Sequence, residues 1–457
     1  MKLNTAVKST PIHTHEGGRA TPTDAFHDLK RSVLTAMLWE NSFYEKGSTI
    51  AERIAGLVPK VKPEQVAALA CEARDRMNLR HVPLFLVSEL SKVKGAGALV
   101  ADTLAHVIQR ADELPEFVAI YWGDKKHPLS AGVKRGLARA FGKFDEYKLA
   151  KWNRDSKIKL RDCLFLVHAK PADQAQADLW KRLVADELAI PDTWEVALSA
   201  KCDKRETFER LIREGKLGGM ALLKNLKGML DANVDEGLIR ERLSHGAARA
   251  FPYRFVVAAK FASRLEDAIE QAMFKAVQDM DLLQGKTGLL IDVSGSMDYR
   301  LNTRGESKTY IQHEHMAGKE ETSRIDVAAG LAILLREKSE SVRVATFSEN
   351  VVELAPRRGF ALRDLIKQSQ PHGGTRLKAA LDAIRPHWAG LDRIIVITDE
   401  QSQDGIAEAW LDKSYVVNVA SYEHGVSYRN RWRHVDGWSE RVIDFIREVE
   451  ILDEATA

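Results

Sequence analysis

The chain has 457 residues, 45% of them hydrophobic and 29% charged, a globular composition that excludes wholesale disorder. No stretch approaches the roughly 18 consecutive apolar residues of a membrane span, and the N-terminus lacks the apolar core of a signal peptide. The three cysteines are widely spaced and form no CxxC pair, which suits a reducing compartment, so we expect a cytoplasmic protein.

The net charge of +3 hides one basic segment. Residues 131–170 hold 11 Lys and Arg against 4 Asp and Glu, whereas the chain from Lys286 onward holds 23 against 27. A short excess of this kind predicts a polyanionic partner, although most Lys and Arg clusters are simply solvated helix faces.

The first 284 residues contain two parts. Residues 1–24 are rich in Thr, Pro, His and Gly and are expected to form an N-terminal arm. Residues 25–284 show apolar side chains at helical spacing, as in TIAERIAGLV and PEQVAALACEARDRM, with Pro63, Pro83 and Pro115 near segment boundaries. Short consecutive helices of this kind indicate an α-solenoid of the HEAT type.

The pattern changes at residue 285, and residues 285–457 alternate strands with helices. This predicts a doubly wound α/β domain with a mainly parallel sheet, whose ligands bind beyond the carboxyl ends of the strands. The expected elements, in order, are strand 286–293, helix 324–340, strand 341–348, helices 361–369 and 376–388, strand 392–399, short helix 407–413, strand 415–421 and closing helix 439–452.

Oxygen-bearing side chains follow these strand ends. Two hydroxyls and a carboxylate lie within Asp292-Val293-Ser294-Gly295-Ser296, a second carboxylate is Asp399, and Thr375 adds a hydroxyl on a glycine turn. Taken singly, these pieces fit a strand end with a capping Ser, a turn, and an isolated Asp. Together they offer the oxygen ligands that a small hard cation needs.

The set is similar to the metal-ion-dependent adhesion site of von Willebrand factor A domains. That resemblance implies that Ser294, Ser296 and Thr375 ligate a divalent cation directly, with Mg²⁺ the expected ion. It implies that Asp292 and Asp399 act mainly through bound water.

The whole chain resembles the TROVE family, the Ro autoantigen and its bacterial relatives. The segments that carry the resemblance are Gly219–Leu226, Ala250–Phe255, Leu149–Arg154 leading to Val167–Pro171, and Val435–Trp438. The family implies HEAT-like helices closed into a ring by a von Willebrand factor A domain. It also implies a monomeric, non-enzymatic ribonucleoprotein in RNA quality control. Small stem-loop (Y-like) RNAs would bind a basic outer surface, 3′ ends of misfolded RNAs would enter a central hole, and an exoribonuclease is a possible partner.

The basic segment lies where the family binds RNA. Aromatic residues interleave with its charges and suit base stacking. His168 follows an apolar run and is open to two interpretations, a capping residue or, by the resemblance, an RNA contact. The predicted RNA-binding residues are Lys134, Arg135, Arg139, Lys148, Lys151, Arg154, Lys157 and His168.

The sequence departs from the family pattern in a polar insertion, residues 298–323, which we expect to be disordered. It holds His313 and His315, too few ligands for a second metal site. Two other functions stay open. One is a metal-dependent protein-interaction adaptor without RNA. The other, disfavoured because the carboxylates are too few, is a metal-dependent nuclease.

Overall fold

The computed structural model describes most of the chain. The described residues are 25–34, 47–77, 79–247, 250, 252–298, 322–419, 431–436 and 442–456. The predicted N-terminal arm and all but the ends of the insertion at 298–323, including both of its histidines, lie outside the described residues.

Helices make up the described chain before the sheet. They are α1 (Ala25–Leu34), α2 (Gly47–Leu57), α3 (Pro63–Asp75), α4 (His81–Leu90), α5 (Gly97–Val107), α6 (Glu113–Trp122), α7 (Ala131–Phe141), α8 (Glu146–Trp152), α9 (Leu160–Val167), α10 (Gln174–Ala185), α11 (Trp194–Ser199), α12 (Lys204–Arg213), α13 (Gly219–Asp231), α14 (Glu236–Ser244), α15 (Pro252–Phe261) and α16 (Glu266–Val277). Alternate helices stack on one another, α3 on α5 on α7 and then α12 on α14 on α16, as in a solenoid. No helix in these ranges has the length and hydropathy to cross a bilayer.

Prolines mark helix starts as the sequence predicts. Pro63 is the first residue of α3, and Pro83 and Pro115 are the third residues of α4 and α6. A proline is tolerated in the first turn because the backbone N–H that it lacks has no intrahelical partner there.

A six-stranded sheet follows. Its strands are β1 (Leu283–Asp292), β2 (Ser339–Phe347), β3 (Val351–Glu353), β4 (Arg393–Thr398), β5 (Lys413–Asn418) and β6 (Arg433–Asp436), in the order β3-β2-β1-β4-β5-β6. All neighbours pair in parallel except β2 and β3. The helices of this part are α17 (Arg324–Glu337), α18 (Gly359–Gln368), α19 (Leu377–Trp388) and α20 (Val442–Thr456). The predicted fold class, a helical solenoid plus a doubly wound α/β part, is confirmed.

Two local predictions were wrong, and one strand was missed. Residues 407–413 form no helix: Ala407 and Ala409 are buried against the sheet face that carries α19, and the chain enters β5 at Lys413. The edge strand β3 was not predicted, and β6 follows the strand that was expected to be the last. Strands of three or four residues are too short for a two-residue alternation to stand out in a sequence.

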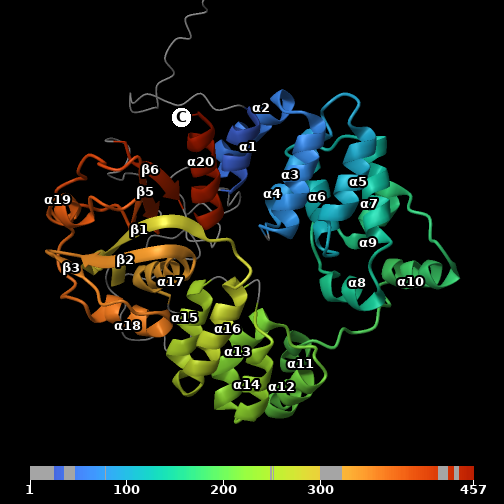
Figure 1. Ribbon diagram of the computed structural model, residues 1–457. Coiled ribbons are helices and arrows are strands. Elements are labelled where there is room, and N and C mark those ends of the chain that lie inside the picture. Colours follow the sequence, from blue (N-terminus) through green and yellow to red (C-terminus); the bar gives the residue numbers. More distant parts are fainter. Residues whose placement is uncertain are drawn as a thin grey trace, which may run out of the picture.

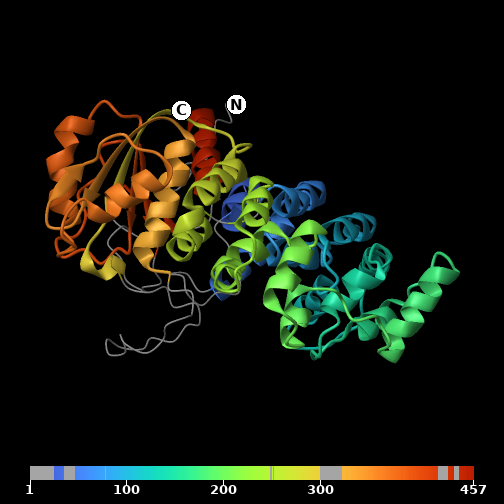
Figure 2. The same cartoon turned by 90° about the horizontal axis from the view of Figure 1, so that it is seen from below.

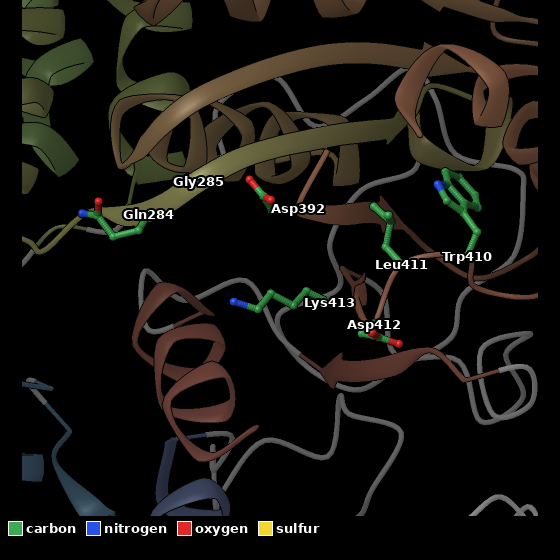
Figure 3. Close-up of a pocket in the computed structure, with 7 residues that line it drawn as sticks. All are labelled: Gln284, Gly285, Asp392, Trp410, Leu411, Asp412 and Lys413. Carbon is green, nitrogen blue, oxygen red and sulfur yellow. The ribbon is translucent and has the colours of Figure 1, made fainter. Parts of the chain in front are cut away.

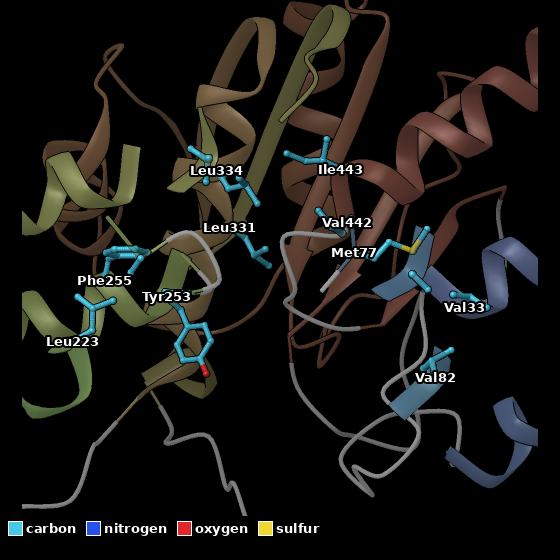
Figure 4. Packing of buried hydrophobic residues seen from close by; sticks show 14 of the residues in the cluster. Val33, Met77, Val82, Leu223, Tyr253, Phe255, Leu331, Leu334, Val442 and Ile443 are labelled. Carbon is cyan, nitrogen blue, oxygen red and sulfur yellow. The ribbon is translucent and has the colours of Figure 1, made fainter. Parts of the chain in front are cut away.

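The two faces of the sheet pack differently. Leu290, Val396 and Val416 belong to an apolar cluster with α19. Residues on the opposite face join a larger cluster that continues through α17 and α20 into the solenoid helices. Figure 4 shows this continuity, with Leu331 and Leu334 of α17 near Phe255 of α15, and Val442 and Ile443 of α20 on the side of Val33. Because one apolar cluster runs through both parts, their predicted division at 284/285 stays a prediction.

The solenoid forms an arc whose two ends both meet the α/β part (Figure 1). At one end α15 packs on α17, and at the other α1 contacts α20, where Lys30 pairs with Glu448 at 3.1 Å. Figure 2 shows the sheet at one end of the molecule and α10 at the other. The family resemblance implies a ring closed by the α/β part, and the described helices follow that plan.

Candidate metal centre and nucleic-acid interface

The two predicted acidic metal residues follow adjacent parallel strands. β1 ends at Asp292, and β4 ends one residue before Asp399. β1 lies between β2 and β4, so the order of the strands reverses here. Such a switch point is where open α/β sheets bind ligands.

Hydrogen bonds fix the first loop around Asp292. Its Oδ1 accepts from the Ser294 backbone N–H at 2.8 Å, and its Oδ2 accepts from the Thr398 hydroxyl at 2.6 Å. The Oγ atoms of Ser294 and Ser296 lie 3.2 Å apart. Asp292 and Ser294 are fully buried, whereas Ser296 is half-buried, so the second hydroxyl lies nearer the surface.

The other two predicted segments meet this loop. The Gly295 N–H donates to the Gly373 carbonyl at 3.0 Å, which ties the first loop to the glycine turn. The carbonyl of buried Thr375 accepts from the Gln403 N–H at 2.9 Å, which ties the turn to the loop after Asp399. The structure therefore brings the three segments with all five predicted metal residues together.

The charges in this centre favour a cation. Burial, and then the negative charge of fully buried Asp399, raise the pKa of the Asp292 carboxyl. Two buried carboxylates side by side are costly unless a positive charge compensates them. The oxygen-only donor set therefore fits a small hard cation.

Arg324 already supplies one positive charge there, which the sequence did not indicate. This first residue of α17 donates from Nη1 to Asp399 Oδ2 at 2.7 Å and to the Ser296 carbonyl at 3.1 Å. Its side chain is 13% exposed. No short motif signals this contact, because Arg324 and Asp399 lie 75 residues apart.

The centre is not a dense carboxylate site. Across the described ranges, no group of three or more His, Cys, Asp or Glu could hold a metal ion. Glu400 is buried beside Asp399, in a left-handed backbone conformation.

The predicted RNA-binding residues lie on and around α7, α8 and α9. Helix α7 packs closely on α5: a Cβ on Gly132 would lie 2.4 Å from the Gly97 carbonyl oxygen. The glycine, valine and leucine side of α7 is thus buried, which leaves Arg135 and Arg139 exposed and Lys134 half-buried. Lys148, Arg154 and Lys157 are exposed on α8 and the segment after it.

Three positively charged side chains lie near the ring of Trp152, which ends α8. The Arg110 guanidinium carbon lies 3.8 Å from its ring centroid, and the Arg154 guanidinium carbon lies 4.8 Å away. Lys151 Nζ lies 5.8 Å from the same ring. These are cation–π distances. Arg110 lies outside the predicted basic segment and was missed.

The predicted cations differ in how far they are neutralised. Arg139 is paired with Asp102, and Lys148 lies 3.6 Å from Asp145. Among the residues the structure describes, Lys134, Arg135 and Lys157 have no ion-pair partner, and neither do Lys151 and Arg154, which lie against the Trp152 ring. Their charge is therefore the most available for phosphate.

The backbone of His168 fits the first of its two predicted interpretations, a capping residue. It ends α9 in the left-handed conformation, and its N–H donates to the Phe165 carbonyl at 3.4 Å, so its backbone acts as a cap. Its side chain is exposed at the carboxyl end of this helix. A contact with RNA stays a prediction.

A separate hollow lies at the opposite, amino-terminal edge of the sheet (Figure 3). It has a volume of about 500 Å³ and is lined by Gln284, Gly285, Asp392, Trp410, Leu411, Asp412 and Lys413. Asp392 Oδ2 accepts from the Lys286 N–H at 2.7 Å and so shapes the turn into β1. None of the predicted site residues lines this hollow.

Residues 169–351 match the sequence model of the TROVE domain. Over these residues the chain is similar to the TROVE domain. The match runs from the end of the basic segment through the solenoid into the first strands of the sheet, so it crosses the predicted boundary. It includes Asp292, Ser294 and Ser296 but ends before Thr375 and Asp399.

Known proteins with similar chains are of two kinds. The crystal structure of the Deinococcus radiodurans Ro (RSR) protein superposes with a TM-score of 0.66, over 93% of this chain and 98% of that one. At 16% identity this likeness shows a shared fold. Telomerase protein component 1 is 37% identical in Mus musculus, over 47% of this chain, and 22% identical in Rattus norvegicus, over 48% of it. The chain spans only 12% of the length of either relative.

Proposed function

We propose that this protein binds noncoding RNA in RNA quality control and catalyses no reaction on it. Small stem-loop, Y-like RNAs bind the basic surface, defined as Lys134, Arg135, Arg139, Lys148, Lys151, Arg154, Lys157 and His168 together with Arg110. Single-stranded 3′ ends of misfolded RNAs enter the centre of the helical arc. The chain acts as a cytoplasmic monomer and works beside an exoribonuclease or another RNA-processing protein.

The basic surface carries this proposal. Five of its Lys and Arg residues have no ion-pair partner within the described ranges, and Arg110, Lys151 and Arg154 lie against one aromatic ring. Unpaired cations bind phosphate with salt-dependent affinity and little sequence preference. RNA helices are recognised mainly by shape and backbone, for which such a surface is suited. The TROVE domain and the Ro-like fold support the same function.

Charge reversal tests it. The triple variant Lys134→Glu, Arg135→Glu, Lys157→Glu changes exposed or half-exposed side chains and should leave the fold intact. Fluorescence anisotropy with a stem-loop RNA that carries a 3′ tail should show weaker binding. The salt slope should fall by about three, because each of the three cations would otherwise neutralise one phosphate.

The matched control is Lys60→Glu, Lys62→Glu, Lys94→Glu. These lysines are exposed near α3 and α4, and the change in net charge is the same. This control variant should bind the RNA with nearly wild-type affinity. An equal loss of RNA affinity in both variants would show that net charge alone, and not this surface, determines binding. Absence of RNA binding by the wild-type protein at low salt would refute the proposal.

We further propose a divalent cation, Mg²⁺, at the switch point. Ser294, Ser296 and Thr375 ligate it directly, and Asp292 and Asp399 hold it mainly through water. Neutral hydroxyl ligands leave such an ion able to bind an outside anion. Calorimetric titration of the Asp292→Ala variant should show no Mg²⁺ binding if these residues form the site.

The alternative function is a metal-dependent adaptor that needs no RNA. The observation that favours it is the buried carboxylate pair at the sheet's switch point. In that case Asp292→Ala would abolish capture of a protein partner, whereas reversal of the basic surface would leave it intact.

A further inference from the structure

Arg324 occupies the position from which a cation would neutralise the metal centre. Its guanidinium contacts a carboxylate oxygen of Asp399 and the backbone carbonyl of Ser296, two of the five residues of the proposed site. Arginine stays protonated at any physiological pH, so this contact places a permanent positive charge among the proposed ligands.

The hydrogen bonds of the two carboxylates single out one oxygen atom. Both oxygens of Asp292 accept from groups fixed by the sheet and its loop, the Thr398 hydroxyl and the Ser294 N–H. Asp399 Oδ1 accepts from the Gln401 N–H at 3.2 Å. The remaining oxygen, Asp399 Oδ2, accepts from a long side chain that can rotate away.

A divalent cation held between the two loops would face this guanidinium at close range. Two positive charges a few ångströms apart in a buried site repel strongly. We propose that Arg324 and a divalent cation bind the centre alternately, so that Arg324 neutralises Asp399 when the metal is absent and leaves when the metal enters. The inference rests on the proposed metal site.

The helix that carries Arg324 is held in place independently of this exchange. Asp326, two residues on, is fully buried and accepts from Lys260 of α15 and, at 3.0 Å, from Lys367 of α18. Burial would raise the pKa of Asp326, but Lys367 and Lys260 outweigh it and keep the pKa below its usual value. The charged Asp326 therefore anchors the first turn of α17 independently of the Arg324 side chain.

Arg324→Met tests the exchange, because methionine keeps much of the apolar stem and removes the charge. In calorimetric titrations of the full-length protein with Mg²⁺, this variant should bind at least about tenfold more tightly than wild type. Arg324→Lys retains a charge and should bind close to wild type. The control is Arg343→Met, which removes an arginine of β2 that pairs with Glu353 of the neighbouring strand β3. This control should leave the affinity for Mg²⁺ unchanged.

Thermal unfolding gives a second readout. In EDTA, Arg324→Met should unfold at a lower temperature than wild type, because its buried carboxylates lack a counter-charge. Saturating Mg²⁺ should raise its midpoint by more than that of wild type. If Arg324 only held the loops together, Arg324→Met would unfold at a lower temperature than wild type both in EDTA and in Mg²⁺. Its affinity for Mg²⁺ would then be no higher than that of wild type.

The outcomes separate the two proposals. Mg²⁺ binding by wild type with equal or weaker binding by Arg324→Met overturns the exchange and leaves the metal site standing. No Mg²⁺ binding by either protein overturns the metal site and the exchange together. Neither result bears on RNA binding at the basic surface.

Discussion

At the scale of single residues, each candidate site contains one arginine that the sequence did not single out. The clustering of the five predicted metal residues could be foreseen because a strand-end motif is local and the carboxyl ends of parallel strands meet. Arg324 and Arg110 act on Asp399 and Trp152, 75 and 42 residues away in the chain. Such contacts are set by how helices pack, and no spacing rule encodes them.

Arg110→Gln tests whether the missed arginine belongs to the basic surface. Its guanidinium also pairs with Asp112 at 2.7 Å, a partly exposed pair worth about 0–1 kcal/mol, so stability should change little. RNA affinity should fall, and the salt slope should decrease by about one. Anisotropy titrations at several salt concentrations measure both. An unchanged slope would place Arg110 outside the RNA interface.

At the scale of elements, the sequence predicted the long periodic helices and the buried strands, but not the short edge strands β3 and β6. The wrong helix at 407–413 shows why. Its residues favour a helix, yet Ala407 is buried and its carbonyl accepts from the Trp432 indole N–H at 2.8 Å, which fixes an irregular segment over the sheet. Tertiary packing outweighed a weak local preference.

The contact between α15 and α17 depends on one glycine. A Cβ on Gly330 would lie 2.8 Å from the Tyr253 backbone nitrogen, which is too close. Gly330→Ala should therefore force the helices apart and cost about 1–3 kcal/mol in the free energy of unfolding. Gly228→Ala on α13 has open space and should be neutral or stabilising by up to about 1 kcal/mol. Chemical denaturation compares the two, and equal stability would show that α15 and α17 tolerate a wider spacing.

At the scale of the whole molecule, the arc and the α/β part share one apolar cluster and meet at two places. The sequence predicted a solenoid and a doubly wound sheet, and the resemblance supplied the ring. Closure itself depends on side chains from opposite ends of the chain, such as Lys30 and Glu448. The basic surface lies on the solenoid and the metal centre on the sheet, so RNA and metal can be tested separately.

The most direct test of RNA binding is crosslinking and sequencing of the RNA that copurifies with the protein from its own cells. The comparison is a triple variant, Lys151→Glu, Arg154→Glu, His168→Asn, in which asparagine tolerates the left-handed backbone at position 168. We expect a small stem-loop RNA to be enriched with wild type and absent with the variant. No RNA above background with either protein would contradict the account and favour the metal-dependent adaptor.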